Sequence, residues 1–218
     1  MAFTNPTTPN LADFASYVTE QGVPSADLPT GTLTGVSVDT SGNLTATGFT
    51  GTVAVGMVLT GSGISAPLYL ATWNGTNAGT VTPAPAQALS ITTATLLSPY
   101  LQWAFDAGVN LTLIPPADMP AILYVMACYQ LAMHQLLKMA QDQTGQTFFT
   151  QQRTTYGLLS FSAGPVISSG DQGTHQTLAE PEFLKGLTVS TLDLLKTPWG
   201  RESMAYSQQY GENIVGVS

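Results

Sequence analysis

Charge is the feature this sequence has least of, and basic charge is scarcest. Charged residues make up 8% of the 218 residues, where about 25% is usual. All basic residues come after residue 137, and the formal net charge is -8. They are Lys138, Arg153, Lys185, Lys196 and Arg201. Tight binding to a phosphate backbone needs clustered cations. The composition therefore excludes a single chain that grips nucleic acid tightly.

Cysteine and uninterrupted apolar sequence are also scarce. Cys128 is the single cysteine, which excludes an intrachain disulfide and a cysteine-based zinc site, and its apolar neighbours predict a buried structural thiol. The first residues lack the cationic start and apolar run of a signal peptide, so we expect no export by that route. The most apolar stretch, residues 121–140, contains Gln130, His134 and Lys138, which predicts a buried helix rather than a membrane span.

No set of residues typical of catalysis or metal binding stands out. The two histidines are 41 positions apart, and for His134 we expect a helix position with local hydrogen-bond partners. Asp171 and His175 lie in one polar loop, but a pair without a nucleophile or a third ligand is weak evidence for a site. An enzyme is thus the third choice of function, and loss of activity on changing Asp171 or His175 would revive it. We expect no cofactor and no metal.

Helical patterns occur near the N-terminus and in the second half of the chain. Asn10 is a suitable cap for a helix that carries Leu11, Phe14, Ala15 and Val18 on one face and ends at Gly22. A second helix is predicted from Pro99 to Gly108, and a central one over about residues 117–143, roughly 40 Å long at 1.5 Å per residue. A last helical stretch is expected over residues 180–195, and a polar loop over residues 168–173.

Between the helical regions, residues 32–97 are rich in Gly, Thr, Val and Ala, in short alternating runs separated by turn residues. This pattern predicts a small β-module inserted into a helical host. The expected fold class is α+β, a compact bundle of about four helices with an inserted antiparallel β-sandwich or barrel-like module. The expected domains are residues 1–30 with 98–218, including a C-terminal arm, and the insert 31–97.

Aromatic residues in polar surroundings indicate where a partner would bind. One pair follows the central helix, and the others lie in the Gln- and Ser-rich C-terminal stretch. The alternative, ordinary packing of a C-terminal helix on its own domain, is equally compatible with the sequence. The candidate partner-binding residues are Phe148, Phe149, Trp199, Arg201, Tyr206 and Tyr210.

Three segments resemble a known family. The helix at residues 124–134 (YVMACYQLAMH), the Gly/Ser segment at 156–162 (YGLLSFS) and the run at 195–202 (LKTPWGRE) look like the head-completion adaptors, or head-to-tail connectors, of tailed bacteriophages. Those proteins end with a similar Thr-Pro-aromatic-Gly signature after a helical bundle. The stretch 55–64 (VGMVLTGSGI) also resembles small β-modules of phage neck and tail proteins. The similarity covers about residues 10–30 and 98–205, and the β-insert departs from the pattern.

The resemblance implies a structural virion protein made in the host cytoplasm and located at the neck. It implies a homo-oligomeric ring, usually of twelve copies, that binds the portal protein on one side and a tail-side neck, terminator or collar protein on the other. During genome ejection DNA would pass through the lumen without specific binding. Because the chain is acidic, we predict that carboxylates and few cations line that lumen.

The main rival is another class of virion part. In this alternative the chain is a tail-fibre or baseplate binding module, and its β-region recognises a surface glycan or another virion protein. An exposed aromatic groove on the β-module would favour it.

Overall fold

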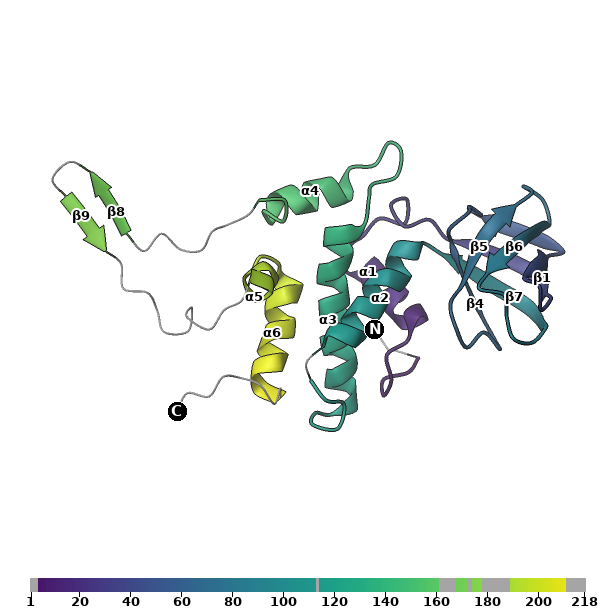
Figure 1. Ribbon diagram of the computed structural model, residues 1–218, viewed down its shortest axis with the longest axis horizontal. Coiled ribbons are helices and arrows are strands. Elements are labelled where there is room, and N and C mark those ends of the chain that lie inside the picture. The colour runs from purple at the N-terminus through teal and green to yellow at the C-terminus, as the bar shows by residue number, and fades with distance from the viewer. Residues whose placement is uncertain (1–3, 113, 161–167, 172–173, 178–188, 211–218) are drawn as a thin grey trace.

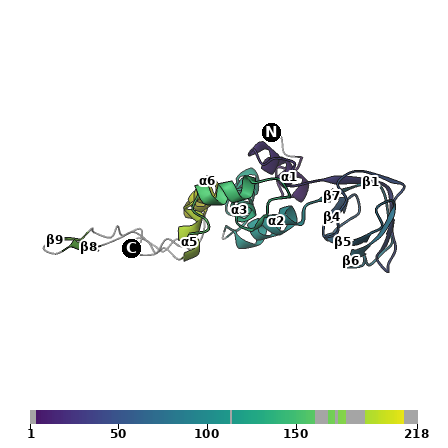
Figure 2. The ribbon, with the colours of Figure 1, turned by 90° about the horizontal axis from the view of Figure 1, so that it is seen from above.

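The computed structural model describes residues 4–112, 114–160, 168–171, 174–177 and 189–210. These residues form three parts along one long axis, as Figures 1 and 2 show. A β-barrel lies at one end, the helices lie in the middle, and a two-stranded hairpin projects at the other end.

The middle part, here called the helical body, is built around one central helix. Helix α3 packs against α1, α2, α4 and α6 (Figure 1). Phe14, Tyr129, Leu136 and Phe149 are all 0% exposed in its core. The helices are α1 (Leu11–Glu20), α2 (Pro99–Leu111), α3 (Ala121–Met139), α4 (Phe148–Thr155), α5 (Val189–Leu194) and α6 (Pro198–Tyr210).

Helix α1 confirms the prediction made from its cap and stripe. The Asn10 side chain accepts a hydrogen bond from the Asp13 backbone N–H at 2.9 Å, as an N-cap residue should. Phe14 and Val18 are buried on the face that meets α3. The backbone turns away at Gly22, whose φ of 87° suits glycine.

The predicted ends of the next two helices are wrong. Gly108 does not end α2, which continues to Leu111. The glycine instead lets α2 approach α3 closely. Helix α3 begins after Pro120 and ends at Met139. Its 19 residues span about 28 Å at 1.5 Å per residue, less than predicted. The extended backbone of Pro120 and of Ala140 limits it at both ends.

The β-module is a closed barrel. Antiparallel pairings run in the order β2-β6-β5-β4-β7-β1, and β1 also pairs with β2, which closes six strands into a ring. Strand β3 is extra and pairs with the first half of β1. The strands are β1 (Gly31–Val38), β2 (Asn43–Thr45), β3 (Gly48–Gly51), β4 (Val58–Gly61), β5 (Leu68–Trp73), β6 (Ala78–Thr82) and β7 (Leu89–Leu97). Inward-facing aliphatic side chains such as Leu33, Leu59 and Leu96 fill its core.

The predicted fold, a compact bundle of about four helices with a sandwich or barrel-like insert, is therefore corrected. The described residues hold six helices and a closed six-stranded antiparallel barrel with one extra strand. Helices α4 and α6 were missed because their sequences are mostly polar. Closure of the barrel depends on long-range strand pairing that local periodicity does not reveal. The class α+β remains partly consistent with this architecture.

The polar loop expected at residues 168–173 is also corrected. Ser168–Asp171 (β8) and Thr174–Thr177 (β9) pair antiparallel in a four-residue register, and we call this pair the hairpin. No strand pattern is visible here because the two strands contain no apolar residues to alternate.

Candidate functional site

A polar cluster with a buried centre, here called the junction, joins α3 to the start of α6. It consists of His134, Lys138, Asp193, Lys196 and Thr197. His134 Nδ1 lies 2.8 Å from Thr197 Oγ1, and the two residues are 1% and 0% exposed. Asp193 Oδ2 lies 2.5 Å from Lys138 Nζ, and Asp193 Oδ1 lies 3.6 Å from Lys196 Nζ. The junction thus connects α3 to the residues that precede and begin α6.

Thr197 has two roles in the junction. Its Oγ1 accepts a hydrogen bond from the Gly200 backbone N–H at 3.0 Å, which caps the first turn of α6. The hydroxyl donates its hydrogen to His134 Nδ1 when the imidazole proton is on Nε2, the nitrogen that faces Asp193. That last gap, 3.6 Å from Nε2 to Asp193 Oδ2, is too long for a hydrogen bond.

The order Asp193, His134, Thr197 is reminiscent of a nucleophile activated by a histidine. However, the Thr197 hydroxyl is buried at 0% exposure and is used as a helix cap, so no substrate reaches it. The arrangement fits a structural role, in which a hydrogen-bonded histidine fixes α6 against α3.

Burial lowers the pKa of His134 from 6.5 to about 4, although the neighbouring Asp193 carboxylate acts in the opposite direction. Burial alone would raise the pKa of Asp193, but the hydrogen bond and charge of Lys138 lower it below its ordinary value. At neutral pH the junction therefore holds a neutral imidazole beside an ionised Asp193–Lys138 pair.

The lowered pKa of His134 predicts acid sensitivity. Between pH 6.5 and 4 the unfolded chain binds a proton on this imidazole that the folded chain does not, so folding stability decreases as pH falls through that window. The slope reaches at most about 1.4 kcal/mol per pH unit. Urea unfolding followed by circular dichroism at several pH values measures it. The His134→Gln variant retains His175, and a slope equal to that of the wild type would contradict the prediction.

The aromatic pair predicted to bind a partner is partly internal. Phe149 is 0% exposed and packs in the core of the helical body, so it offers no surface to another molecule. Phe148 is half-buried and meets Phe149 edge-on, with ring centroids 5.3 Å apart. Both belong to the first turn of α4, where Asp142 accepts the backbone N–H groups of Phe149 and Thr150.

The other candidates lie on α6 and mostly contact their own chain. Trp199 donates from Nε1 to the Gln21 Oε1 at 2.9 Å, and its ring meets Tyr156 edge-on. Arg201 is exposed and donates to the Leu195 carbonyl at 3.2 Å. The half-buried Tyr206 and Tyr210 pack beside Ile114, Met119 and Ala127. The structure does not gather the six candidates into one patch, and their role in partner binding stays a prediction.

The sequence reasoning missed an aromatic pair on the barrel. Phe49 on β3 is 42% exposed and meets Trp73, at the end of β5, edge-on at 5.9 Å. Strand parity could not have found it, because Phe49 pairs with the buried Leu33 and directly paired side chains lie on the same face of a sheet. Phe49 is exposed because β3 is the extra strand outside the closed ring. Parity does not place Trp73 either, because a register shift between Leu70 and Thr72 interrupts β5.

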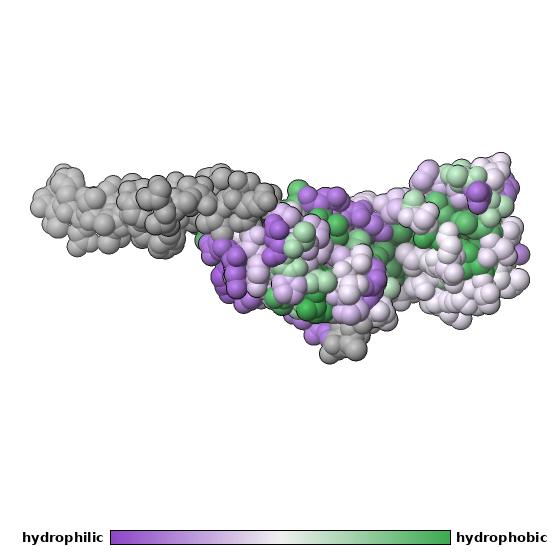
Figure 3. Space-filling view, turned by 90° about the horizontal axis from the view of Figure 1, so that it is seen from below, coloured by the Kyte–Doolittle hydropathy of each residue, from purple (hydrophilic) through white to green (hydrophobic). Residues whose placement is uncertain are grey.

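The barrel surface around this pair is almost uncharged. Asp39 is the single charged residue between positions 31 and 97, and its carboxylate accepts hydrogen bonds from Ser41 and Asn43 within a turn. In Figure 3 the barrel surface is mainly pale with some hydrophobic areas, whereas the helical body carries strongly hydrophilic patches.

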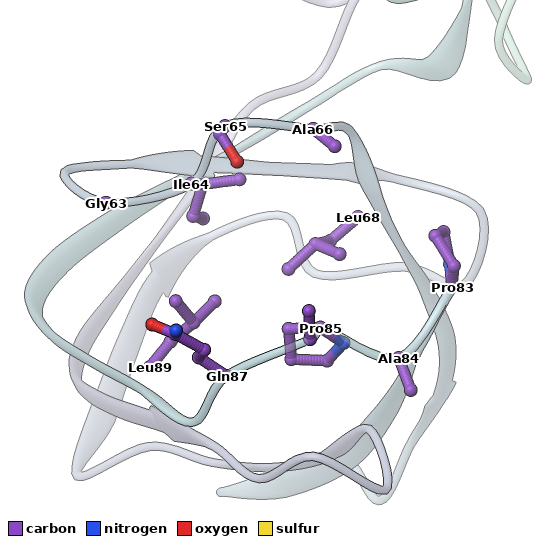
Figure 4. Close-up of a pocket in the computed structure, with 11 residues that line it drawn as sticks. Gly63, Ile64, Ser65, Ala66, Leu68, Pro83, Ala84, Pro85, Gln87 and Leu89 are labelled. Atoms are coloured by element: carbon purple, nitrogen blue, oxygen red, sulfur yellow. The ribbon is translucent and has the colours of Figure 1, made fainter.

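One end of the barrel holds an open pocket of about 340 Å³. Two loops line it, residues 62–67 after β4 and residues 83–88 after β6, and Figure 4 shows Ile64, Leu68 and Pro85 beside the hollow. The polar side chains among its lining residues are Ser65 and Gln87. The pocket has room for a small apolar group but lacks the ionisable side chains that catalysis requires.

Among the described residues, no three His, Cys, Asp or Glu side chains are grouped to hold a metal ion, and no helix has the length and apolar character to cross a membrane. Cys128 is buried, as predicted, and burial raises the pKa of its thiol to about 11. In the hairpin His175 pairs with Gly170 and Asp171 with Thr174, but their side chains lie outside the described part of the chain.

A buried carboxylate lies in the connection between α1 and the barrel. Asp27 is 0% exposed, and neither of its carboxylate oxygens has a hydrogen-bond partner. Burial raises the pKa of Asp27, and the charge of Asp142 adds to this effect. Asp27 therefore opposes folding when it is ionised.

This cost predicts a stabilising substitution. Asp27→Asn removes the ionisation, so we expect a higher melting temperature than that of the wild type at pH 7.5. The gain should shrink as pH falls toward the ordinary aspartate pKa of 3.8, because the carboxyl is then protonated in both states. Thermal unfolding at pH 7.5 and pH 4 measures both. The exposed Asp118→Asn serves as control and should change stability by less than about 0.5 kcal/mol. Equal melting temperatures for Asp27→Asn and the wild type at pH 7.5 would count against a raised pKa.

Comparisons with protein-family models, with curated proteins and with solved structures found no match to this chain.

Proposed function

We propose that this chain is a non-enzymatic structural subunit of a tailed-phage virion, a head-to-tail adaptor that forms a ring between the portal and the tail-side neck proteins. The observation that carries the proposal is the junction. Two segments that resemble the adaptor family, residues 124–134 and 195–202, are far apart in sequence and meet through the buried His134–Thr197 hydrogen bond. They therefore behave as parts of one folded unit.

The shape of the chain supports an assembly role. The hairpin and the barrel project from opposite ends of the helical body (Figures 1 and 2). A subunit with different surfaces at its two ends can form head-to-tail contacts, and such contacts close into a ring when the rotation between neighbours allows it. The ring would contain about twelve copies if it follows the family that the sequence resembles.

The charges are compatible with a channel through which DNA slides. Every described cation is engaged within the chain: Lys138 and Lys196 by Asp193, Arg153 by the carbonyls of Leu137 and Ala140, and Arg201 by the carbonyl of Leu195. Exposed or half-exposed carboxylates remain at Glu20, Asp106, Asp118 and Glu202. We propose that residues among these carboxylates face the lumen. A continuous basic lining of the lumen would contradict this proposal.

The first test is electron microscopy of the purified chain mixed with the portal protein of the same phage. Rings stacked coaxially on the portal are expected, and the barrel should be visible as a projection from each subunit. Absence of any association between the chain and the portal would overturn the adaptor function.

A second candidate function is a tail-fibre or baseplate module that recognises a glycan. The Phe49–Trp73 pair, in which Phe49 is exposed, favours it, because sugars stack on aromatic rings and the surrounding surface is neutral. Binding of host surface polysaccharide to the chain, lost in the Phe49→Ala variant and retained in Trp103→Ala, would favour this function. Trp103 is a suitable control because it is a similarly exposed aromatic residue, 47% exposed, on α2.

A further inference from the structure

The hairpin has no strand partner outside itself in the described part of the chain. Among the described residues, β8 and β9 pair with each other and with no other strand. Figures 1 and 2 show them well away from the helical body. A two-stranded hairpin alone in water is marginally stable at best. The structure therefore leaves this element in need of a surface against which to pair.

The barrel offers an unpaired strand edge. Strand β3 pairs with β1 on one side, and no described strand pairs with its other side. The Thr52 N–H donates a hydrogen bond to the Thr30 carbonyl across the β1–β3 ladder. Alternate residues of an antiparallel strand bond to opposite sides, so the backbone N–H and C=O of Phe49 point away from β1, toward the free edge.

This edge lacks the features that usually prevent pairing with another chain. Strand β3 reads Gly-Phe-Thr-Gly. It has neither the charged side chains nor the proline that protect edge strands in natural proteins. The exposed ring of Phe49, set against Trp73, lies on the same strand and provides an apolar contact for an incoming strand.

We infer that the hairpin of one copy adds to the β3 edge of a neighbouring copy and extends the barrel sheet from one subunit to the next. Each hairpin strand has four residues, as β3 has, so the backbone groups match in number. Main-chain hydrogen bonds would supply the affinity, and coverage of the Phe49–Trp73 pair would supply apolar contact. This inference rests on the proposed ring.

The hairpin that pairs with the β3 edge comes from a second copy of the chain, as the positions of the hairpin and the barrel indicate. The hairpin and the barrel are at opposite ends of one chain, with the helical body between them (Figure 1). A contact between unlike ends of identical chains is heterologous, the type that builds rings. The barrel region is also the least charged part of an acidic chain, so copies meeting there avoid repulsion between like charges.

Cross-linking between two kinds of subunit tests the inference. One batch of full-length chain carries Thr50→Cys on β3, and a second carries Ser169→Cys on β8. A short bis-maleimide is added to the mixture, with and without the portal protein. The native Cys128 is 0% exposed and should not react. We expect a covalent dimer that contains one chain of each kind.

The matched control replaces Thr50→Cys with Ser41→Cys, which is exposed in the turn after β1. Thr50 pairs with Thr32, so the turn lies about 20 Å away along β1 at 3.3 Å per residue. The inference predicts several-fold more dimer with Thr50→Cys than with Ser41→Cys. It also predicts loss of rings when residues 168–177 are replaced by a Gly/Ser linker of equal length.

Each outcome separates the inference from the proposed function. Rings that form without the Thr50–Ser169 cross-link, and that survive replacement of the hairpin, would overturn the strand addition and leave the adaptor function intact. If the copies associate neither alone nor on the portal, both proposals fail. Polysaccharide binding that requires Phe49, together with no cross-link, would assign the same edge to a glycan.

Discussion

Replacing Thr197 with valine is expected to destabilise the helical body by about 2–4 kcal/mol, the sum of a lost helix cap and an unsatisfied buried imidazole nitrogen. Valine has nearly the shape of threonine, so the packing is kept while the hydroxyl is removed. The hydroxyl links the Gly200 N–H of α6 to His134 Nδ1 of α3, and both contacts are buried. Urea unfolding followed by circular dichroism at 222 nm measures the loss.

Two further variants show whether the hydroxyl is responsible. Thr197→Ser retains the oxygen and should recover most of the lost stability. Thr154→Val removes an exposed hydroxyl that bonds to the Thr150 carbonyl within α4, and it should change stability by less than about 0.5 kcal/mol. If Thr197→Val were as stable as the wild type, the junction would not hold α6 against α3.

The junction also shows why sequence reasoning reached part of the site and not the rest. His134 was correctly expected on a helix, because its neighbours carry an apolar stripe, but the expectation of local hydrogen-bond partners was wrong. Its hydrogen-bond partner could not be identified, since Thr197 lies 63 positions away and belongs to a helix whose sequence is polar. A helix such as α6 is recognisable from its cap: Thr197 precedes Pro198 at the first helical position, which is a typical start signal.

Sequence signals predicted a helix well where its N-cap residue and its stripe of apolar residues agree. Asn10 with Phe14 and Val18 predicted α1 almost to its ends. Gly108 misled because glycine has two uses in helices, as a terminator and as a point of close approach, and sequence periodicity does not distinguish them. In the β-module the strand runs were recognisable. Closure, however, depends on β1 pairing with β7 and on β2 pairing with β6, which are distant contacts.

The candidate partner surface illustrates the same limit. Phe148, Phe149, Trp199, Tyr206 and Tyr210 stand in polar sequence, which made them look like exposed anchors. Polar sequence surrounds them because α4 and α6 each bury a narrow face, and the aromatic rings lie on or near that face. The aromatic residue that is exposed on the barrel, Phe49, stands among Gly and Thr and pairs with the buried Leu33, so its sequence pattern does not reveal the exposure.

The close approach of α2 and α3 gives the second large effect. A Cβ atom at Gly108 would lie 2.5 Å from the Cys128 carbonyl oxygen and 2.6 Å from Ala132 Cβ, distances that require α3 to move. Gly108→Ala is therefore expected to cost about 1–3 kcal/mol from overpacking, although alanine by itself favours a helix by about 1 kcal/mol. Urea unfolding again measures the change.

Overpacking and helix preference change the stability of Gly108→Ala in opposite directions, so the sign of the measured change distinguishes them. If intrinsic helix preference decided the outcome, Gly108→Ala would be more stable than the wild type, and that result would contradict the packing argument. Removing one of the opposing atoms tests the contact directly. Ala132→Gly weakens α3 on its own, but in the double variant it should relieve part of the clash, so the two changes together should cost less than the sum of their separate effects. Additive effects would mean that Ala132 is not part of the clash and that only the Cys128 carbonyl opposes a side chain at Gly108.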